Sequence, residues 1–140
     1  MEEKYIITVV GKQTVDGEED KIEVITEGDI RIEGDKITIT YPEYPEDDPS
    51  QKTDTTVILD NGVLSIERTG EMSSHLILEQ GVRHECLYHT PMGQMFIGIF
   101  TDSISADIGE HGGEINAAYQ LDFNRVVVSY NEFYISVKEK

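Results

Sequence analysis

Apolar and polar residues alternate with a period of two through almost the whole 140-residue chain, and this feature most constrains its fold. Side chains of a β-strand point alternately to its two faces, whereas an amphipathic helix repeats its apolar face every 3.6 residues. No stretch of twelve or more residues keeps the helical period. The sequence therefore predicts an all-β protein with short turns rich in Gly, Asn and Asp. Strands are expected at residues 4–12, 20–33, 36–43, 53–60, 63–69, 73–79, 84–90, 94–109, 114–123 and 128–138.

The Asn61-Gly62 dipeptide is the strongest hairpin signal, because both central positions of a type I′ turn need positive φ. A two-residue loop there fixes which residues of the flanking strands face each other. The expected pairs are Leu59 with Leu64, Val57 with Ile66, and Thr55 with Arg68. The other face carries Asp60, Ser65 and Glu67, so these pairs are expected to point into the protein.

Two further turns predict hairpins with one apolar face each. The Gly34-Asp35 turn is expected to place Ile32 opposite Ile37, Ile30 opposite Ile39, Gly28 opposite Tyr41, and Thr26 opposite Glu43. A four-residue loop at 110–113 is expected to place Ile108 opposite Ile115, Ala106 opposite Ala117, and Ile104 opposite Tyr119.

Ten antiparallel strands with one apolar face each must bury that face. A sandwich of two sheets needs long crossovers, whereas every connection here is short except an acidic, proline-rich segment at 42–49. A closed meander also removes exposed strand edges. The fold class expected is therefore all-β: one domain over residues 1–140, a closed up-and-down antiparallel barrel of about eight to ten strands.

The charge balance limits the classes of partner. There are 28 acidic and 11 basic side chains, a net charge of −17, which argues against binding to nucleic acid or to anionic membranes. The single cysteine, Cys86, cannot form an intramolecular disulfide, and the N-terminal residues do not predict a signal peptide or membrane span. A cytoplasmic protein with a reduced thiol is expected.

Six short motifs lie at residues 16–20, 26–28, 68–70, 79–84, 88–93 and 112–115. Together they resemble the YwiB-like family of uncharacterised bacterial β-barrel proteins. The order Arg-His followed by Tyr-x-Thr-Pro-x-Gly, at 83–84 and 88–93, is fairly specific. This resemblance spans nearly the whole chain and implies a calycin-like barrel, related in topology to the lipocalins, in a family without an established activity. Lipocalins carry Gly-x-Trp near the first strand and this chain has no Trp, so their transport of hydrophobic ligands is not implied.

Arg68 is the residue most informative about function. The hairpin at Asn61-Gly62 points it inward, where an unpaired charge costs several kcal/mol. The guanidinium could grip a carboxylate or phosphate of a ligand. Alternatively, it forms an internal pair with Glu43 or Glu27, or extends to solvent at the rim.

A polar stripe is expected along the strand at 84–90. His84, Cys86, Tyr88 and Thr90 share one face, which points inward if the loop at 80–82 has three residues. A two-residue loop would turn Arg83, Glu85 and Leu87 inward instead. The stripe could bind an amphiphilic anion near Arg68, or it could be a structural hydrogen-bond network.

The sequence predicts no metal site, no cofactor and no catalytic residues. His84 and His89 are five residues apart on a strand and so point to opposite faces, unlike the histidines of a helical H-E-x-x-H motif. No Gly-rich phosphate loop precedes a helix, and no serine stands in a nucleophile elbow. Nothing in the sequence requires catalysis.

The function expected is therefore binding of a small molecule, with an anion as one candidate, in or at the mouth of the barrel. The residues expected to line this site are Thr26, Tyr41, Arg68, His84, Tyr88 and Thr90. One alternative is a module that binds an unknown protein partner through its acidic surface, including the segment 43–48. Another is an enzyme that uses Arg68 and His84 on an anionic substrate.

Overall fold

The chain folds into ten antiparallel strands, as the alternation predicts. The computed structural model describes residues 5–43, 53–69, 74–90 and 93–140, with backbone only for 88–90. The strands are β1 (Tyr5–Val15), β2 (Glu18–Glu33), β3 (Lys36–Glu43), β4 (Thr53–Asp60), β5 (Val63–Thr69), β6 (Ser74–Glu79), β7 (Arg83–Thr90), β8 (Gly93–Gly109), β9 (Gly112–Phe123) and β10 (Val126–Glu139).

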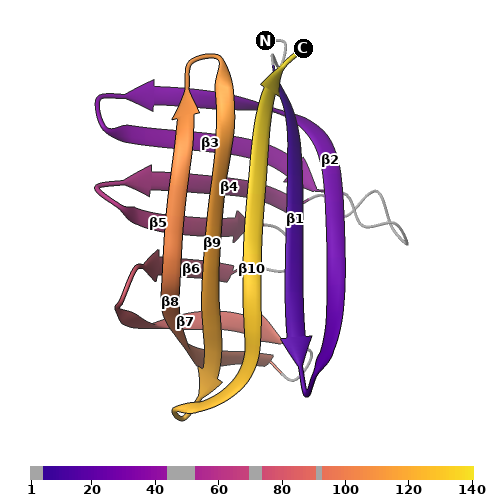
Figure 1. Cartoon of the computed structure of the whole chain (residues 1–140), viewed down its shortest axis with the longest axis vertical. Coiled ribbons are helices and arrows are strands. Elements are labelled where there is room, and N and C mark those ends of the chain that lie inside the picture. The colour runs from indigo at the N-terminus through magenta and orange to yellow at the C-terminus, as the bar shows by residue number, and fades with distance from the viewer. Residues whose placement is uncertain (1–4, 44–52, 70–73, 91–92) are drawn as a thin grey trace.

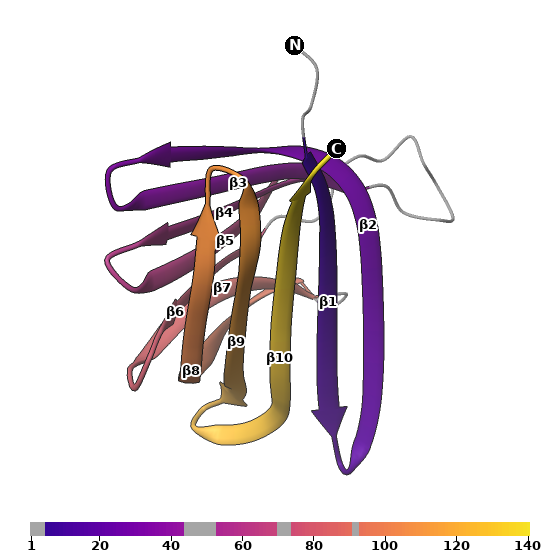
Figure 2. The same cartoon turned by 45° about the horizontal axis from the view of Figure 1, so that its top comes forward.

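The strands form one continuous sheet in the order β6-β5-β4-β3-β2-β1-β10-β9-β8-β7. Figure 1 shows β8, β9, β10, β1 and the first half of β2 as a front layer, with β3 to β6 crossing behind them. Figure 2 shows how the long β2 curves from the front layer into the rear one. β2 pairs with β1 up to Gly28 and with β3 from Asp29 onward, so it joins the two layers.

The barrel is nearly closed, and its one open seam lies between β6 and β7. The two strands are tied at their turn, where the Val82 N–H donates to the Glu79 carbonyl at 3.0 Å and the Gly81 N–H to the Thr101 carbonyl at 2.8 Å. Further along, the Ile77 N–H donates to Cys86 Sγ at 3.4 Å. The first and last strands, β1 and β10, pair along ten residues of each, which closes the other side.

The loop between β6 and β7 corrects one step of the sequence argument. Glu79 pairs with Val82, so the loop has two residues. Nevertheless Cys86 is buried while Glu85 and Leu87 are exposed, which is the facing expected from the longer loop. The reason is that β7 takes its facing from β8, where His84 lies opposite the fully buried Ile99, and not from a ladder with β6.

The residue pairs next to the turn are confirmed in two of the three predicted hairpins. In the third hairpin the predicted pairing is shifted by two residues. The pairs predicted around Asn61-Gly62 all form, as do Ile32 with Ile37 and Ile30 with Ile39. The β8–β9 loop is shorter than predicted: Ile108 pairs with Gly113, Ala106 with Ile115, and Ile104 with Ala117. Gly112 and Gly113 lie within β9, where a Cβ would meet the Val137 and Asp107 carbonyl oxygens at 2.2 and 2.0 Å, so close strand approach explains these glycines.

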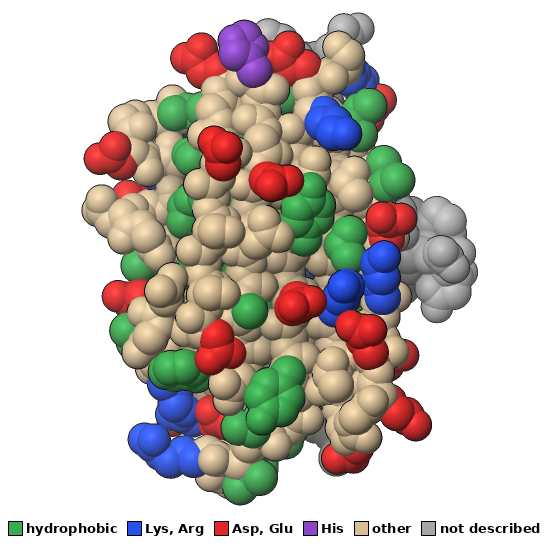
Figure 3. Space-filling model, viewed as in Figure 1, with side chains coloured by type: hydrophobic (Ala, Val, Ile, Leu, Met, Phe, Trp, Pro, Cys, Tyr) green, Lys and Arg blue, Asp and Glu red, His purple; other side chains and the backbone are tan. Residues whose placement is uncertain are grey.

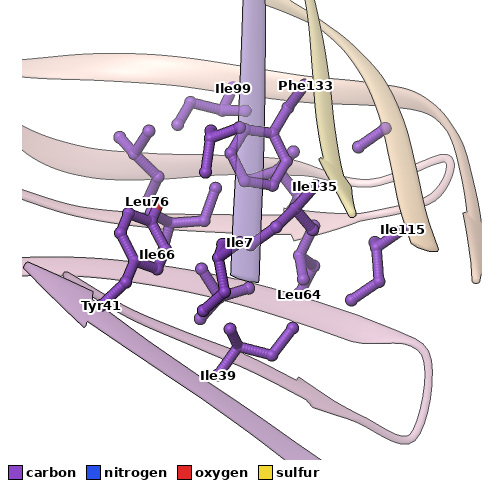
Figure 4. Close-up of a cluster of buried hydrophobic side chains, with 14 of the residues drawn as sticks. Ile7, Ile39, Tyr41, Leu64, Ile66, Leu76, Ile99, Ile115, Phe133 and Ile135 are labelled. Carbon is purple, nitrogen blue, oxygen red and sulfur yellow. The ribbon is translucent and has the colours of Figure 1, made fainter. Parts of the chain in front are cut away.

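Aliphatic side chains from both layers fill the interior. Figure 4 shows Ile7, Ile39, Leu64, Ile99 and other side chains pointing toward one another between the layers. Several of them have no exposed surface at all, which is the packing expected of a solid core. Of the aromatic residues, Phe133 belongs to this core, whereas Phe96 and Phe123 are exposed on the outside.

Candidate functional site

A row of polar side chains crosses the rear layer at one end of the hydrophobic core. Tyr41 on β3 pairs with Thr55 on β4, Thr55 pairs with Arg68 on β5, and Arg68 pairs with Ser74 on β6. In these strands the alternate positions Ile39, Val57 and Ile66 are buried, so the row shares the inward face. The β3–β4 ladder and the Asn61-Gly62 hairpin therefore bring together a phenol, a hydroxyl and a guanidinium.

The row contains polar atoms that are buried without a hydrogen-bond partner in the described part of the chain. They are the Tyr41 hydroxyl, Thr55 Oγ1 and Arg68 Nε; Tyr41 and Thr55 are 3% and 1% exposed as residues, and the Arg68 side chain is 32% exposed. A fourth such atom, Thr101 Oγ1, lies away from the row on β8. Buried polar groups in native proteins are almost always hydrogen-bonded, and each exception calls for an explanation.

Glu43 is the carboxylate beside Arg68. Its Oε1 lies 3.9 Å from Arg68 Nε, too far for a hydrogen bond, although the charges attract. Glu27, the other partner considered from the sequence, instead pairs with Lys140 at 2.7 Å. Arg68 thus has a loose ion pair at a half-buried position and retains donors for another acceptor.

The fold places Tyr41 against Gly28 but separates Thr26 from Glu43. A Cβ on Gly28 would lie 3.0 Å from Tyr41 Cβ, so the two residues are in contact, as the hairpin predicted. Thr26 is half-buried and pairs with Ile7 on β1. Its predicted pairing with Glu43 is wrong, because β2 turns away from β3 at Gly28 to join the front layer.

Burial raises the pKa of Tyr41 well above its ordinary value; the charge of the Glu43 carboxylate and its approach to the phenol raise it further, whereas Arg68 and the Thr55 hydroxyl lower it. The phenol is therefore protonated at neutral pH, and it lies near Thr55 and Glu43 without a hydrogen bond of good geometry to either. Together with the Arg68 guanidinium and the Thr55 hydroxyl, it presents three donors on neighbouring strands. Such a set is suited to the oxygen atoms of a carboxylate or phosphate.

Tyr41→Phe is expected to lose less stability than the wild type between pH 8 and pH 11. The unfolded phenol ionises near pH 10, whereas the folded one keeps its proton, so the wild type should lose up to about 1.4 kcal/mol per pH unit above pH 10 from this group. Urea unfolding of both proteins at pH 8 and pH 11 measures the difference. At pH 8 the variant should be equally or more stable, because its phenyl ring leaves no unpaired hydroxyl. Equal losses in both proteins between the two pH values would contradict the raised pKa.

His84, a member of the predicted polar stripe of β7, lies far from the row formed by Tyr41, Thr55, Arg68 and Ser74, called here the Arg68 row. His84 Nε2 lies 3.0 Å from Glu79 Oε1, at the far end of β6 from Ser74, which is about 16 Å along the strand. Burial raises the pKa of the inward Cys86 thiol, which makes it a poor nucleophile. Tyr88 and Thr90 belong to β7, but their side chains lie outside the described residues, as does the acidic segment beyond Glu43.

A hollow of about 440 Å³ lies on the outer face of the front layer. In it Lys12 lies opposite Lys21 on β2 and Glu132 on β10, with Ala118 and Ser103 continuing the hollow across the neighbouring strands. Figure 3 shows basic side chains side by side over β1 and β2. Lys12 and Glu132 form a loose, exposed pair at 3.9 Å, and the hollow is open to solvent.

The described residues contain no group of three or more His, Cys, Asp and Glu side chains that could hold a metal ion. They also contain no helix long and apolar enough to cross a membrane.

Sequence reasoning identified Tyr41 and Arg68 but did not count Thr55 and Glu43 as members of the site. The signal for Thr55 was present, since the Asn61-Gly62 turn places it opposite Arg68 on the inward face. An inward-facing threonine that lies opposite both an arginine and a tyrosine is a candidate site residue by position. Sequence reasoning considered Glu43 only as an alternative partner of Arg68, and the structure places it there, at 3.9 Å from Nε.

These features define a small β-barrel with a filled core and a row of unpaired donors at one end. A family model described as a domain of unknown function (DUF1934) matches residues 7–135, and the chain belongs to this family. The chain is 27% identical over 123 residues to the uncharacterised β-barrel protein YwiB of Bacillus subtilis (strain 168), covering 86% of this chain and 84% of that protein. The crystal structure of the YwiB protein from Bacillus subtilis superposes with a TM-score of 0.84 at 21% identity, covering 99% of this chain and 92% of the other. The predicted family and barrel fold are thereby confirmed.

Proposed function

We propose that this barrel binds a small oxyanion, a carboxylate or phosphate, at the end of its interior where Tyr41, Thr55 and Arg68 meet. The observation that carries the proposal is the three polar atoms of this row that are buried without a partner. A ligand oxygen near them would satisfy donors that the described part of the protein leaves unpaired. The filled core favours binding at the mouth of the barrel over binding deep inside it.

The position of Arg68 supports access from solvent. Its side chain is about a third exposed, while the Tyr41 and Thr55 side chains are almost completely buried. An anion entering at the rim would therefore meet the guanidinium first and the two hydroxyls behind it. Glu43 would be the competing carboxylate, and at 3.9 Å from Nε it holds the guanidinium only weakly.

Thermal melts of the wild type and Arg68→Met, with and without succinate, benzoate and inorganic phosphate, test the proposal. A ligand at ten times its Kd stabilises the folded state by about 1.4 kcal/mol, so Tm should rise clearly more in the wild type than in the variant. Tyr41→Phe and Thr55→Val should weaken the response without lowering Tm in the absence of ligand, because their hydroxyls are unpaired.

Arg31→Met is the matched control. Arg31 also pairs with a glutamate at 3.9 Å, but its side chain is 76% exposed on β2, so this variant removes the same charge from an unrelated place. It should keep the full ligand response. A large fall in the Tm of ligand-free Arg68→Met, with no response to any anion in either protein, would instead make Arg68 a structural partner of Glu43.

We also propose that the protein works in the cytoplasm. The support is chemical: the single cysteine, Cys86, is free and buried, as expected of a thiol kept reduced.

A further inference from the structure

Three two-residue turns of this chain have similar positive φ values at both positions, but only two of them carry glycine at the second position. Asp16-Gly17 has φ values of 51° and 80°, Asn61-Gly62 has 52° and 79°, and Asn124-Arg125 has 52° and 68°. Glycine is favoured at the second position because a side chain there is strained at positive φ. The turn between β9 and β10 carries an arginine where the other two turns carry glycine, at a cost in backbone strain.

Asp122 fixes two arginines at this turn. Its carboxylate accepts from Arg83 Nε at 2.9 Å and from Arg83 Nη2 at 2.6 Å. It also accepts from the backbone N–H of Arg125 at 3.1 Å. One nearly buried carboxylate thus positions the Arg83 guanidinium and the backbone from which the Arg125 side chain extends.

Gly98 lets the two strands flanking β8 make this contact across it. A Cβ on Gly98 would lie 2.2 Å from Arg83 Nη2 and 2.5 Å from Asp122 Oδ1. The Arg83–Asp122 pair therefore lies directly over the Gly98 backbone, on the outside of the barrel.

The two arginines line a hollow of about 270 Å³ together with Glu85, Phe96, Gly98 and Asn124. Arg83 Nη1 lies 3.2 Å from Glu85 Oε1, so most of its donors are engaged, whereas the Arg125 guanidinium has no ion pair with any described residue. Phe96 is 67% exposed and forms an apolar wall. Figure 3 shows basic side chains gathered near the β9–β10 turn of a surface otherwise rich in carboxylates.

We infer that this outer hollow binds a small anion that carries a planar ring, with its phosphate or carboxylate on Arg125 and its ring against Phe96. The site is distinct from the Arg68 row and does not depend on it. Three observations converge: a strained arginine where glycine is preferred, a second arginine held beside it, and an exposed aromatic side chain on the same hollow. Arginine pairs favour phosphate and carboxylate groups, and aromatic faces favour planar rings.

The inference is tested by titrating the protein with phenyl phosphate, inorganic phosphate or phenol and measuring the chemical shifts of its backbone amides by NMR. Phenyl phosphate should shift the amides of Gly98 and Arg125, and phenol should not. Arg125→Gly should weaken phenyl phosphate binding at least about tenfold while Tm stays the same or rises, because glycine relieves the turn. Phe96→Ala should remove the preference for phenyl phosphate over inorganic phosphate.

Two controls separate this site from the proposed function. In Arg68→Met, phenyl phosphate should still shift the Gly98 and Arg125 amides as it does in the wild type. Arg31→Gln should leave the affinity for phenyl phosphate unchanged although it removes one positive charge. An unchanged affinity in Arg125→Gly, or wild-type shifts confined to other parts of the barrel, would overturn the inference.

Discussion

Gly28→Ala is expected to destabilise the protein by about 3 kcal/mol, although it adds a single methyl group. The new Cβ would lie 2.3 Å from the Thr40 carbonyl oxygen and 2.4 Å from Ile7 Cδ1, with Tyr41 Cβ at 3.0 Å. A backbone oxygen cannot move aside cheaply, and inserting a methyl group into a packed core costs about 1–3 kcal/mol even where side chains give way. Urea unfolding at pH 7 measures the loss.

Gly11→Ala is the control for this prediction. Gly11 lies on the neighbouring β1 with nothing within 4 Å of its Cβ position, and its φ is not positive. Alanine there should be neutral or stabilise by up to about 1 kcal/mol, since it restricts the unfolded chain. Similar losses in both variants would show that glycine entropy, and not the crowding where β2 passes from the front to the rear layer, sets the effect.

Local turn chemistry explains why the positions of Thr55, Arg68 and Tyr41 in the row could be predicted from the sequence. The Asn61-Gly62 turn fixes Thr55 opposite Arg68, and the alternation then decides that both point inward. The contact of Tyr41 with Gly28 follows from the Gly34-Asp35 turn in the same way. Each of these inferences spans fewer than twenty residues and depends on one turn.

Features that depend on closure of the barrel could not be predicted. Thr26 was placed opposite Glu43 because the hairpin was extended past the point where β2 leaves β3. The sequence leaves open whether the stripe with His84 lies near Arg68, and the structure decides it because β7 follows β8 along the seam and His84 lies beside Glu79. In both cases a strand has two possible neighbours, and the choice is made by residues distant in the sequence.

Glycines explain the wrong register of the β8–β9 hairpin. The sequence predicts a loop at Gly112 and Gly113, whereas both lie in β9 where neighbouring carbonyls leave no room for a Cβ. Gly98 likewise lies inside a strand, where Arg83 crosses β8 to reach Asp122. A glycine inside an alternating strand therefore indicates close approach as well as a turn.

Asp122→Asn is expected to lower Tm by about 5 °C at pH 7. The reason is that the Asp122 carboxylate accepts hydrogen bonds from Arg83 Nε, from Arg83 Nη2 and from the backbone N–H of Arg125. An amide has one acceptor oxygen and no charge, so it leaves part of the Arg83 guanidinium unpaired. Asp102→Asn is the matched control: Asp102 accepts from the exposed Gln120 side chain at 3.1 and 3.2 Å, and its change should have little effect.

The pH dependence of this difference identifies the charge as its cause. The hydrogen bonds from Arg83 lower the pKa of Asp122 below its ordinary value of 3.8. A carboxylate with a lowered folded pKa contributes stability that is present above the unfolded pKa and is lost as pH falls through the folded one. The Tm gap between wild type and Asp122→Asn should therefore stay constant from about pH 7 to pH 5 and shrink below about pH 4. A gap that persists undiminished to pH 2 would show that the shape of the side chain matters here and its charge does not. The same gap in Asp102→Asn would show that the contact with Arg83 is not its cause.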